Sequence, residues 1–205
     1  MCKLRVAIGG FLLVGAMQST HASDVDLGVF GVRLGEPLTL PECAFNKRYG
    51  RLSYEIASYK NPPPDCWKRN MLGTPGTPLQ GNETIIVQFR SLPFGFEAGD
   101  PTIKLIEGRV EEFRFTTVGG AQRDVFDALA KKYGTPVSHD VQQVQNRMGA
   151  SFASITAHWS FPNLSVLYLG LSSTVDKGVL VISSSKANQA EQERIEEQKA
   201  AERQL

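Results

Sequence analysis

Cysteine and histidine are the first side chains of this sequence to consider for chemistry. Cys43 lies in "LPECAF" and Cys66 in "NPPPDCWKR". A nucleophilic cysteine needs a nearby base to form its thiolate, and a structural zinc site needs about four ligands. Beyond residue 22 the only histidines are His139 and His158, and their spacing matches no metal motif. We therefore expect neither a cysteine nucleophile nor a bound metal.

Carboxylates are the second candidates for chemistry. Glu107, Glu111 and Glu112 occur together in "EGRVEE", and paired carboxylates can perform acid–base work. On a hairpin, however, we expect them to be solvated edge residues. The sequence contains no Gly-x-Ser-x-Gly elbow, phosphate loop or His-Glu-x-x-His motif. We therefore expect no catalytic residues, no cofactor and no enzymatic activity.

The N-terminus has the layout of a secretory signal peptide over residues 1–22. Two bases in "MCKLR" precede the apolar run "VAIGGFLLVGAM", and small residues follow at Thr20 and Ala22. The run is shorter than the about 20 residues that a transmembrane helix needs. We expect cleavage between Ala22 and Ser23. Because a serine rather than a cysteine follows that bond, a lipid anchor is not expected.

Export sets the charge and the redox environment of the remaining chain. Cleavage removes two of the 22 basic residues and none of the 21 acidic ones, which leaves the chain near neutral. No basic surplus remains to drive phosphate binding, so nucleic acid is a poor partner. No later segment approaches transmembrane length, so stable membrane insertion is not expected either. The predicted location is periplasmic or secreted.

An oxidising location favours a disulfide between the two remaining cysteines, Cys43 and Cys66. The bond closes a loop of about 23 residues, for which chain entropy predicts roughly 3 kcal/mol of stabilisation. Residues 44–82, whose first half lies inside this loop, hold "NPPPDC" and "LGTPGTPLQGN", whose proline and glycine preclude long helices and central strands. We refer to residues 44–82 as the stapled region and expect it to be irregular.

Strand patterns dominate the rest of the chain. Leu27, Val29, Val32 and Leu34 suggest one or two strands broken by glycine near the start. Further along, alternating and β-branched apolar residues predict two strands and two hairpins. These are the strands 84–89 and 178–183, the hairpin 102–118 turning at Glu107 and Gly108, and the hairpin 154–170 turning at Pro162 and Asn163.

Two irregular features are expected between these strands. Val110 is out of phase with Phe113, which predicts a β-bulge or a change of register between them. The polar segment "SHDVQQVQNRMGAS" is interpreted as a connecting loop that contains His139 and Asp140.

One main helix is predicted at about residues 121–133. Val125 and Leu129 are four residues apart, as are Phe126 and Ala130, which gives one broad apolar face. A glycine and a proline in "KKYGTP" end the helix. The order of elements predicts an α+β fold, an antiparallel sheet of hairpins with this helix packed on one face. Residues 23–185 are predicted to form a single domain.

The last segment, residues 186–205, predicts a charged helical tail. It is rich in helix formers and has almost no apolar stripe, while oppositely charged pairs such as Glu191 and Arg194 stand three residues apart. Such a helix has no core contact to hold it, so we expect it to be exposed. An alternative is that it docks on a partner.

The sequence repeats one short pattern. "FGVRLGEP" begins at Phe30 and "FGFEAGDP" begins at Phe94. A duplicated module would explain the match, but the flanking residues do not align. Shared turn chemistry or chance is therefore the favoured explanation.

Residues 108–184 resemble small exported bacterial modules. A helix ending in "LAKKYGTP", followed by a connection and the tryptophan strand "AHWSF", is similar to BamE-type outer-membrane assembly lipoprotein modules and to β-lactamase inhibitor protein repeats. The chain lacks the lipobox cysteine of the first group and shows no tandem copy of the second. The resemblance implies protein binding rather than catalysis, and no site residues carry over from it.

These observations predict an exported bacterial envelope protein that binds another envelope or secreted protein, as an accessory, inhibitor or immunity-type protein. The expected surface is the Cys43–Cys66 loop, with Trp67, Tyr54 and Tyr59 as aromatic anchors. The alternative is a periplasmic hydrolase built around His158 or His139 with a carboxylate brought from elsewhere in the chain. A purely structural envelope component is a third option.

Overall fold

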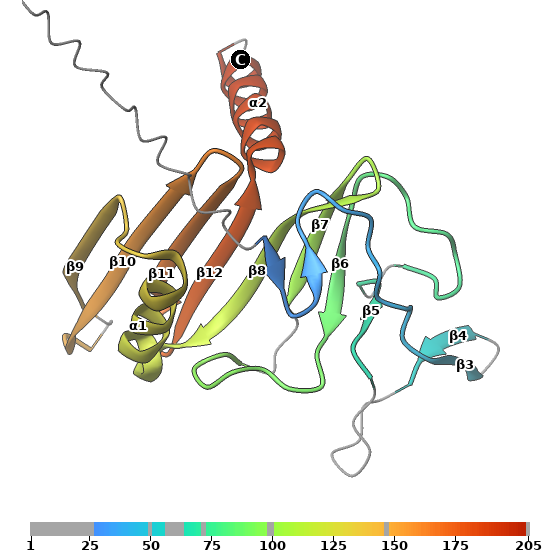
Figure 1. Ribbon diagram of the computed structural model, residues 1–205, viewed down its shortest axis with the longest axis horizontal. Coiled ribbons are helices and arrows are strands. Elements are labelled where there is room, and N and C mark those ends of the chain that lie inside the picture. The colour runs from blue at the N-terminus through green and yellow to red at the C-terminus, as the bar shows by residue number, and fades with distance from the viewer. Residues whose placement is uncertain are drawn as a thin grey trace, which may run out of the picture.

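The computed structural model describes residues 27–48, 51–55, 64–70, 73–97, 101–145 and 148–203 (Figure 1). The predicted signal peptide and its cleavage site between Ala22 and Ser23 lie outside these residues, and so does Tyr59. All structural statements below concern the described residues.

The molecule is built on one antiparallel sheet of eight strands, in the order β5-β6-β7-β8-β12-β11-β10-β9 (Figure 1). Two helices and two short two-stranded hairpins accompany it, so the predicted α+β class is confirmed. The strands of the sheet are β5 (Cys66–Lys68), β6 (Glu83–Gln88), β7 (Thr102–Ile106), β8 (Arg109–Val118), β9 (Ser138–Gln145), β10 (Ser151–Phe161), β11 (Leu164–Thr174) and β12 (Lys177–Ser184).

The sheet consists of two halves with the same connectivity. Four consecutive strands, β5 to β8, are followed by α1 (Gln122–Tyr133), and four more, β9 to β12, are followed by α2 (Ser185–Glu202). The halves meet where β8 pairs with β12, the last strand of each. This topology repeats one unit of four strands and a helix.

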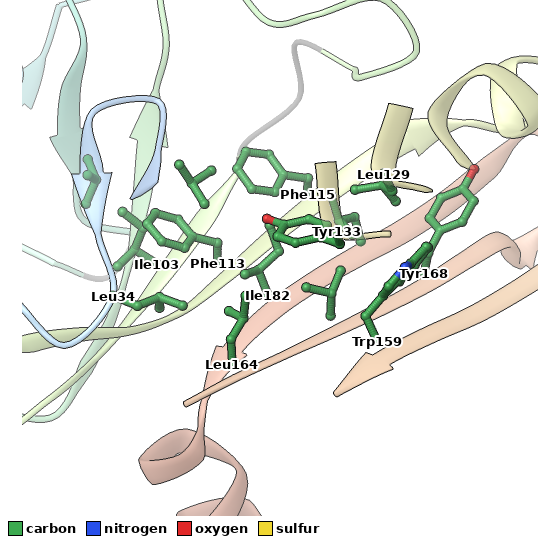
Figure 2. Close-up of a cluster of buried hydrophobic side chains, with 14 of the residues drawn as sticks. Leu34, Ile103, Phe113, Phe115, Leu129, Tyr133, Trp159, Leu164, Tyr168 and Ile182 are labelled. Carbon is green, nitrogen blue, oxygen red and sulfur yellow. The ribbon is translucent and has the colours of Figure 1, made fainter. Parts of the chain in front are cut away.

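The hydrophobic core lies on one face of the sheet. Each strand contributes alternate residues to it, so Phe113 and Phe115 of β8 share the face with Trp159 of β10 and Tyr168 of β11 (Figure 2). Helix α1 covers β8, β10 and β11 on this face. Two buried polar groups join the helix to the sheet: Trp159 Nε1 donates to the carbonyl of Gly134 at 2.8 Å, and the Tyr168 hydroxyl donates to the carbonyl of Gln122 at 3.1 Å.

A small hairpin covers the other half of the same face. Strands β1 (Gly28–Val29) and β2 (Val32–Arg33) match the pair predicted near the start of the chain. Val29, Val32 and Leu34 are buried in the core. The ring of Phe30, at the turn between the strands, lies 5.7 Å from that of Phe115.

The structure contains both the turn and the bulge that were predicted around β8. Glu107 and Gly108 form the turn between β7 and β8, with φ angles of 52° and 75° that suit a type I′ hairpin. The register then changes, because Lys104 pairs with Glu112 while Leu105 pairs with Val110. The predicted bulge is confirmed, and it leaves Glu111 as the extra residue.

The bulge overturns the expectation that the carboxylates of "EGRVEE" are solvated. Glu111 is only 3% exposed, and the hydroxyl of Ser184 donates to its carboxylate. The same hydroxyl accepts the backbone N–H of Ala187 at 3.1 Å and so caps the N-terminus of α2. Glu107, in contrast, is exposed and pairs with Lys186. Two of the three acids therefore hold the start of α2.

The predicted helices are confirmed. Helix α1 follows a short 3₁₀ turn at Gly119–Ala121, buries its apolar face as expected, and ends at Gly134, whose φ is 79°. Helix α2 is exposed along its length, and only Ala187 is buried in it. It projects away from the sheet (Figure 1).

The connecting loop predicted after α1 is wrong. Ser138–Gln145 forms β9, which pairs with β10 through eight successive residues. The segment is polar because both of its faces are exposed, so no apolar alternation marks it as a strand. Its backbone hydrogen bonds to β10, rather than burial of side chains, hold it in place.

Candidate functional site

The stapled region is more regular than the sequence predicted, and Cys43 and Cys66 are joined as expected. It contains β3 (Phe45–Arg48) and β4 (Arg51–Tyr54), which form a hairpin of their own, and β5, which belongs to the main sheet. The β3–β4 hairpin stands beside the β5 edge of the sheet (Figure 1). Both sulfur-bearing residues are buried, and the bond fixes the base of the hairpin to β5.

Glu42 forms a hub on one side of the disulfide. Its carboxylate accepts the hydroxyl of Tyr54 at 2.7 Å and the backbone N–H of Gly76 at 3.0 Å. The Tyr54 oxygen in turn accepts the backbone N–H of Arg69 at 3.2 Å. Partial burial, aided by the carboxylate of Glu42, raises the pKa of Tyr54 to about 12. The tyrosine is therefore a neutral donor that ties β4 to the chain before and after β5.

Arg69 forms a second hub on the other side. Its guanidinium donates to the carbonyls of Thr77 and Pro78 at 2.8 and 2.9 Å, and its Nε lies 3.3 Å from a carboxylate oxygen of Glu83. The side chains of Arg69 and Glu83 are only 10% and 17% exposed. The guanidinium also lies 5.5 Å from the ring centre of Trp67. This network orders residues 73–83, which contain little regular structure.

One face of the hairpin is apolar and partly exposed to solvent. Phe45 pairs with Tyr54, and Lys47 pairs with Leu52, so these four side chains share one face. Phe45 and Leu52 are 38% and 43% exposed. The ring of Phe45 lies 6.3 Å from that of Tyr54, edge to face. An apolar pair held on a fixed hairpin is a suitable anchor for a protein partner.

The hairpin itself carries positive charge, and the acids Glu42 and Glu55 flank it in the sequence. The chain from Cys43 to Tyr54 contains Lys47, Arg48 and Arg51 and no acidic residue. Lys47 and Arg51 are exposed. A complementary surface would therefore combine an apolar patch with acidic residues.

The structure places the three predicted anchors differently. Trp67 is 7% exposed and belongs to the core, so it supports the region from within. Tyr54 is half-buried, and its ring forms part of the hairpin face. Tyr59 is outside the described residues, and the binding roles of all three stay predictions.

Sequence reasoning missed Phe45 and Leu52 as exposed anchors and Glu42 and Arg69 as hubs. The hairpin had a detectable signal, since apolar residues at Phe45 and Leu52 flank "KRYGR" at strand spacing. The hubs had none, because their partners are distant along the chain, as with Glu42 and Gly76 at a separation of 34.

The two histidines of the hydrolase alternative lie on opposite faces of the sheet. His139 pairs with Ala157 on the core face, and its ring stacks on Phe126 at 4.6 Å. His158 faces the other side, where its Nε2 lies 3.0 Å from the Ser165 hydroxyl. The histidines therefore cannot act in one site.

His158 and Ser165 line a shallow pocket of about 310 Å³ under the first turns of α2. Glu191 also lines it, but its carboxylate accepts two hydrogen bonds from Arg194, at 3.0 and 2.7 Å. That partner lowers the pKa of Glu191. The carboxylate of Glu191 is thus bound to arginine, so it is not placed to orient His158 as the acid of a catalytic triad does.

Metal ligands and membrane-spanning helices are the remaining features to consider in the described residues. They contain no group of three or more histidine, cysteine, aspartate or glutamate side chains placed to hold a metal ion. No described helix has both the length and the apolar character needed to cross a membrane. The buried Cys43–Cys66 bond indicates an oxidising location.

Comparison of the chain with protein-family models, curated proteins and solved structures found no match. The resemblance of residues 108–184 to exported bacterial modules therefore stays an expectation from the sequence.

Proposed function

We propose that this protein is an exported, non-enzymatic envelope protein that binds another protein through the face of the β3–β4 hairpin. The observation that supports this most is the exposure of Phe45 and Leu52 on a hairpin that the disulfide and two partly buried hubs hold in place. Preorganisation of this kind lowers the entropic cost of association.

The chemistry of the face indicates the partner. Exposed aromatic and aliphatic side chains favour an apolar pocket, and the cations Lys47 and Arg51 favour an acidic rim around it. The proposed partner is an exported protein with an apolar pocket bordered by aspartate or glutamate. An inhibitor, accessory or immunity-type role fits this mode of binding.

Affinity capture with single-site variants tests the proposal. A tagged protein exported to the cell envelope is isolated with its bound partners, and the capture is repeated with Phe45→Ala and Leu52→Ala. Truncating an anchor in the centre of an interface costs about 2 kcal/mol or more, so each variant should lose most of the captured partner. The matched control is Val118→Ala, because Val118 is 40% exposed at the far end of β8.

The amounts of partner captured by the wild type and the three variants decide whether the hairpin face is the binding surface. Loss of one dominant partner in both hairpin variants, with full capture by Val118→Ala, supports the proposal. Equal capture by all four proteins would show that the hairpin face is not the binding surface.

A hydrolase centred on His158 is the second candidate function. Its specific support is the 3.0 Å contact between His158 Nε2 and the Ser165 hydroxyl inside a pocket. The test is a panel of ester, amide and glycoside substrates with the wild-type protein, His158→Ala and Ser165→Ala. An activity lost in both variants would favour the enzyme over the binding protein.

A further inference from the structure

The two edges of the main sheet differ in how they are protected. At one edge, β5 is three residues long, and the chain at Pro41–Cys43 covers it through bonds from Trp67 N to the Pro41 carbonyl and from Cys43 N to the Trp67 carbonyl. At the other edge, β9 is eight residues long, and within the described residues no strand pairs with its outer side. An open edge of this length is a template for pairing with another strand.

Strand β9 lacks the usual protection of an edge. It contains no lysine, arginine or proline, and its single charged residue is Asp140. Seven of its eight residues are exposed, so little side-chain rearrangement is needed before another strand can approach. Val141 in its centre and Val137 just before it are 50% and 65% exposed.

The backbone groups of β9 that point away from β10 can be identified. The N–H of Val141 donates to the side chain of Asp140 at 2.8 Å, so it points away from β10. On the neighbouring strand β10, the N–H of Ile155 and the carbonyl of Ala153 bond to the side chain of Gln122, on the side away from β9. The backbone groups of the odd-numbered residues of β10 therefore point away from β9, and those of the even-numbered residues point toward it. Because the direction alternates along an antiparallel ladder, the outward-pointing groups of β9 belong to His139, Val141, Gln143 and Gln145.

We propose that two copies of this chain associate by antiparallel pairing of their β9 strands, with Val141 opposite the partner's Val141. A two-fold axis perpendicular to the sheet produces this arrangement and joins the two sheets into one. His139 then lies opposite the partner's Gln143, and the three residue pairs centred on Val141 form about six backbone hydrogen bonds.

Side-chain chemistry in this register favours a second copy as the occupant of the edge. Asp140 lies opposite the partner's Gln142, whose amide already donates to the carboxylate of its own Asp140 at 2.8 Å, so no like charges are directly opposed. Helix α1, which lies beside β9, contributes both signs of charge through the ion pair of Arg123 and Asp127 at 3.3 Å. A copy related by two-fold symmetry therefore meets a surface of balanced charge.

The interface is small, because it is limited to one strand and the flanking side chains. Interfaces at the low end of the size range are weak and transient, so we expect a dissociation constant on the order of 10 μM. The dimer is independent of the β3–β4 hairpin and leaves that face free.

Sedimentation of the purified protein over a concentration series tests the proposal. Wild type should change from monomer to dimer as its concentration rises through the micromolar range. Val141→Lys places two cations opposite each other and should weaken the dimer at least tenfold. The matched control Val118→Lys makes the same change at a similarly exposed valine on an interior strand and should leave association unchanged.

Two further variants test the register. Asp140→Ala removes the acceptor that competes for the outward N–H of Val141, and it should tighten the dimer severalfold. Val141→Cys should form an intermolecular disulfide under mild oxidation, whereas Val118→Cys should not. Circular dichroism confirms that each variant is folded.

Sedimentation as a monomer at every concentration up to about 100 μM, well above the expected constant, would overturn the proposal. So would equal effects of Val141→Lys and Val118→Lys. Binding of β9 to an extended segment of a different protein while the chain itself stays monomeric would also contradict it.

Discussion

Glu111 is a buried acid that helps to hold the start of helix α2. The bulge in β8 turns it toward Ser184, whose hydroxyl it accepts while that hydroxyl caps α2. The alternation of a regular hairpin would have placed its side chain elsewhere. A single inserted residue therefore connects the β7–β8 hairpin to the end of the chain.

Replacing Glu111 by alanine should lower the free energy of unfolding by about 1–3 kcal/mol, because the buried Ser184 hydroxyl loses its acceptor. Urea denaturation measures this change. Glu112→Ala is the matched control, since Glu112 is the next residue and forms an ion pair with the exposed Arg114 at 3.5 Å; its loss should cost less than about 1 kcal/mol. Equal costs for the two variants would contradict the structural role of Glu111.

Tyr54 gives a prediction about alkaline pH. Its pKa is raised from 10.0 to about 12 in the folded protein, so the unfolded chain loses this proton more easily. The stabilisation is therefore fully present below about pH 10 and is lost as the pH rises toward 12. In an ultraviolet titration, Tyr54→Phe should remove a tyrosine that ionises late. Removal of one that ionises near its ordinary pKa would show that the hydroxyl is not bound to Glu42.

Features that depend on neighbouring residues could be predicted from the sequence, whereas the hydrogen-bond hubs at Glu42 and Arg69 could not. The disulfide, the Glu107–Gly108 turn and the bulge each follow from nearby residue types and were predicted. Glu42 and Arg69 look like ordinary surface charges until the chain folds back on them. Their contacts depend on loop positions that no local propensity specifies.

At the scale of elements, the disulfide should contribute measurably to the β3–β4 hairpin. The double variant Cys43→Ala/Cys66→Ala should lose roughly 3 kcal/mol of stability, because it frees a loop of 23 residues in the unfolded chain. Thermal unfolding, with and without reductant, measures the loss. If reductant lowered the stability of the double variant as much as that of wild type, the disulfide would not be the cause.

Helix α2 contributes little to stability beyond its first turn. Only Ala187 is buried in it, and its apolar residues do not form a stripe. Ending the chain after Gln192 should therefore change the free energy of unfolding by less than about 0.5 kcal/mol. Ser184→Ala, which removes both the cap and the donor to the buried Glu111 carboxylate, should cost about 2–3 kcal/mol. A larger cost for the truncation would mean that the distal helix packs on the domain.

Strand β9 shows why one element could not be predicted. Helix α1 and strands β6 and β12 carry apolar patterns, because they bury one face or more. The residues of β9 are exposed on both sides, so neither periodicity nor composition separates them from a loop. Backbone pairing with β10 determines its structure.

At the scale of the whole molecule, the sheet contains two copies of a unit of four strands followed by a helix. No repeated sequence pattern accompanies these two units. The two "FG" motifs do not mark them, because both lie in turns outside the repeated strands. Gly31 and Gly95 have φ angles of 80° and 87°, which only glycine adopts readily. The similarity between the motifs is therefore one of turn chemistry, as the sequence favoured.

The function proposed for the whole molecule is the capture of an exported protein partner by the β3–β4 hairpin. Site-specific photo-crosslinking in cells that export the protein tests it most directly, with the crosslinking residue placed at Leu52 and, as a control of similar exposure, at Val118. The account predicts one dominant crosslinked protein from position 52 and none from position 118. The same products from both positions, or no product from position 52, would contradict it.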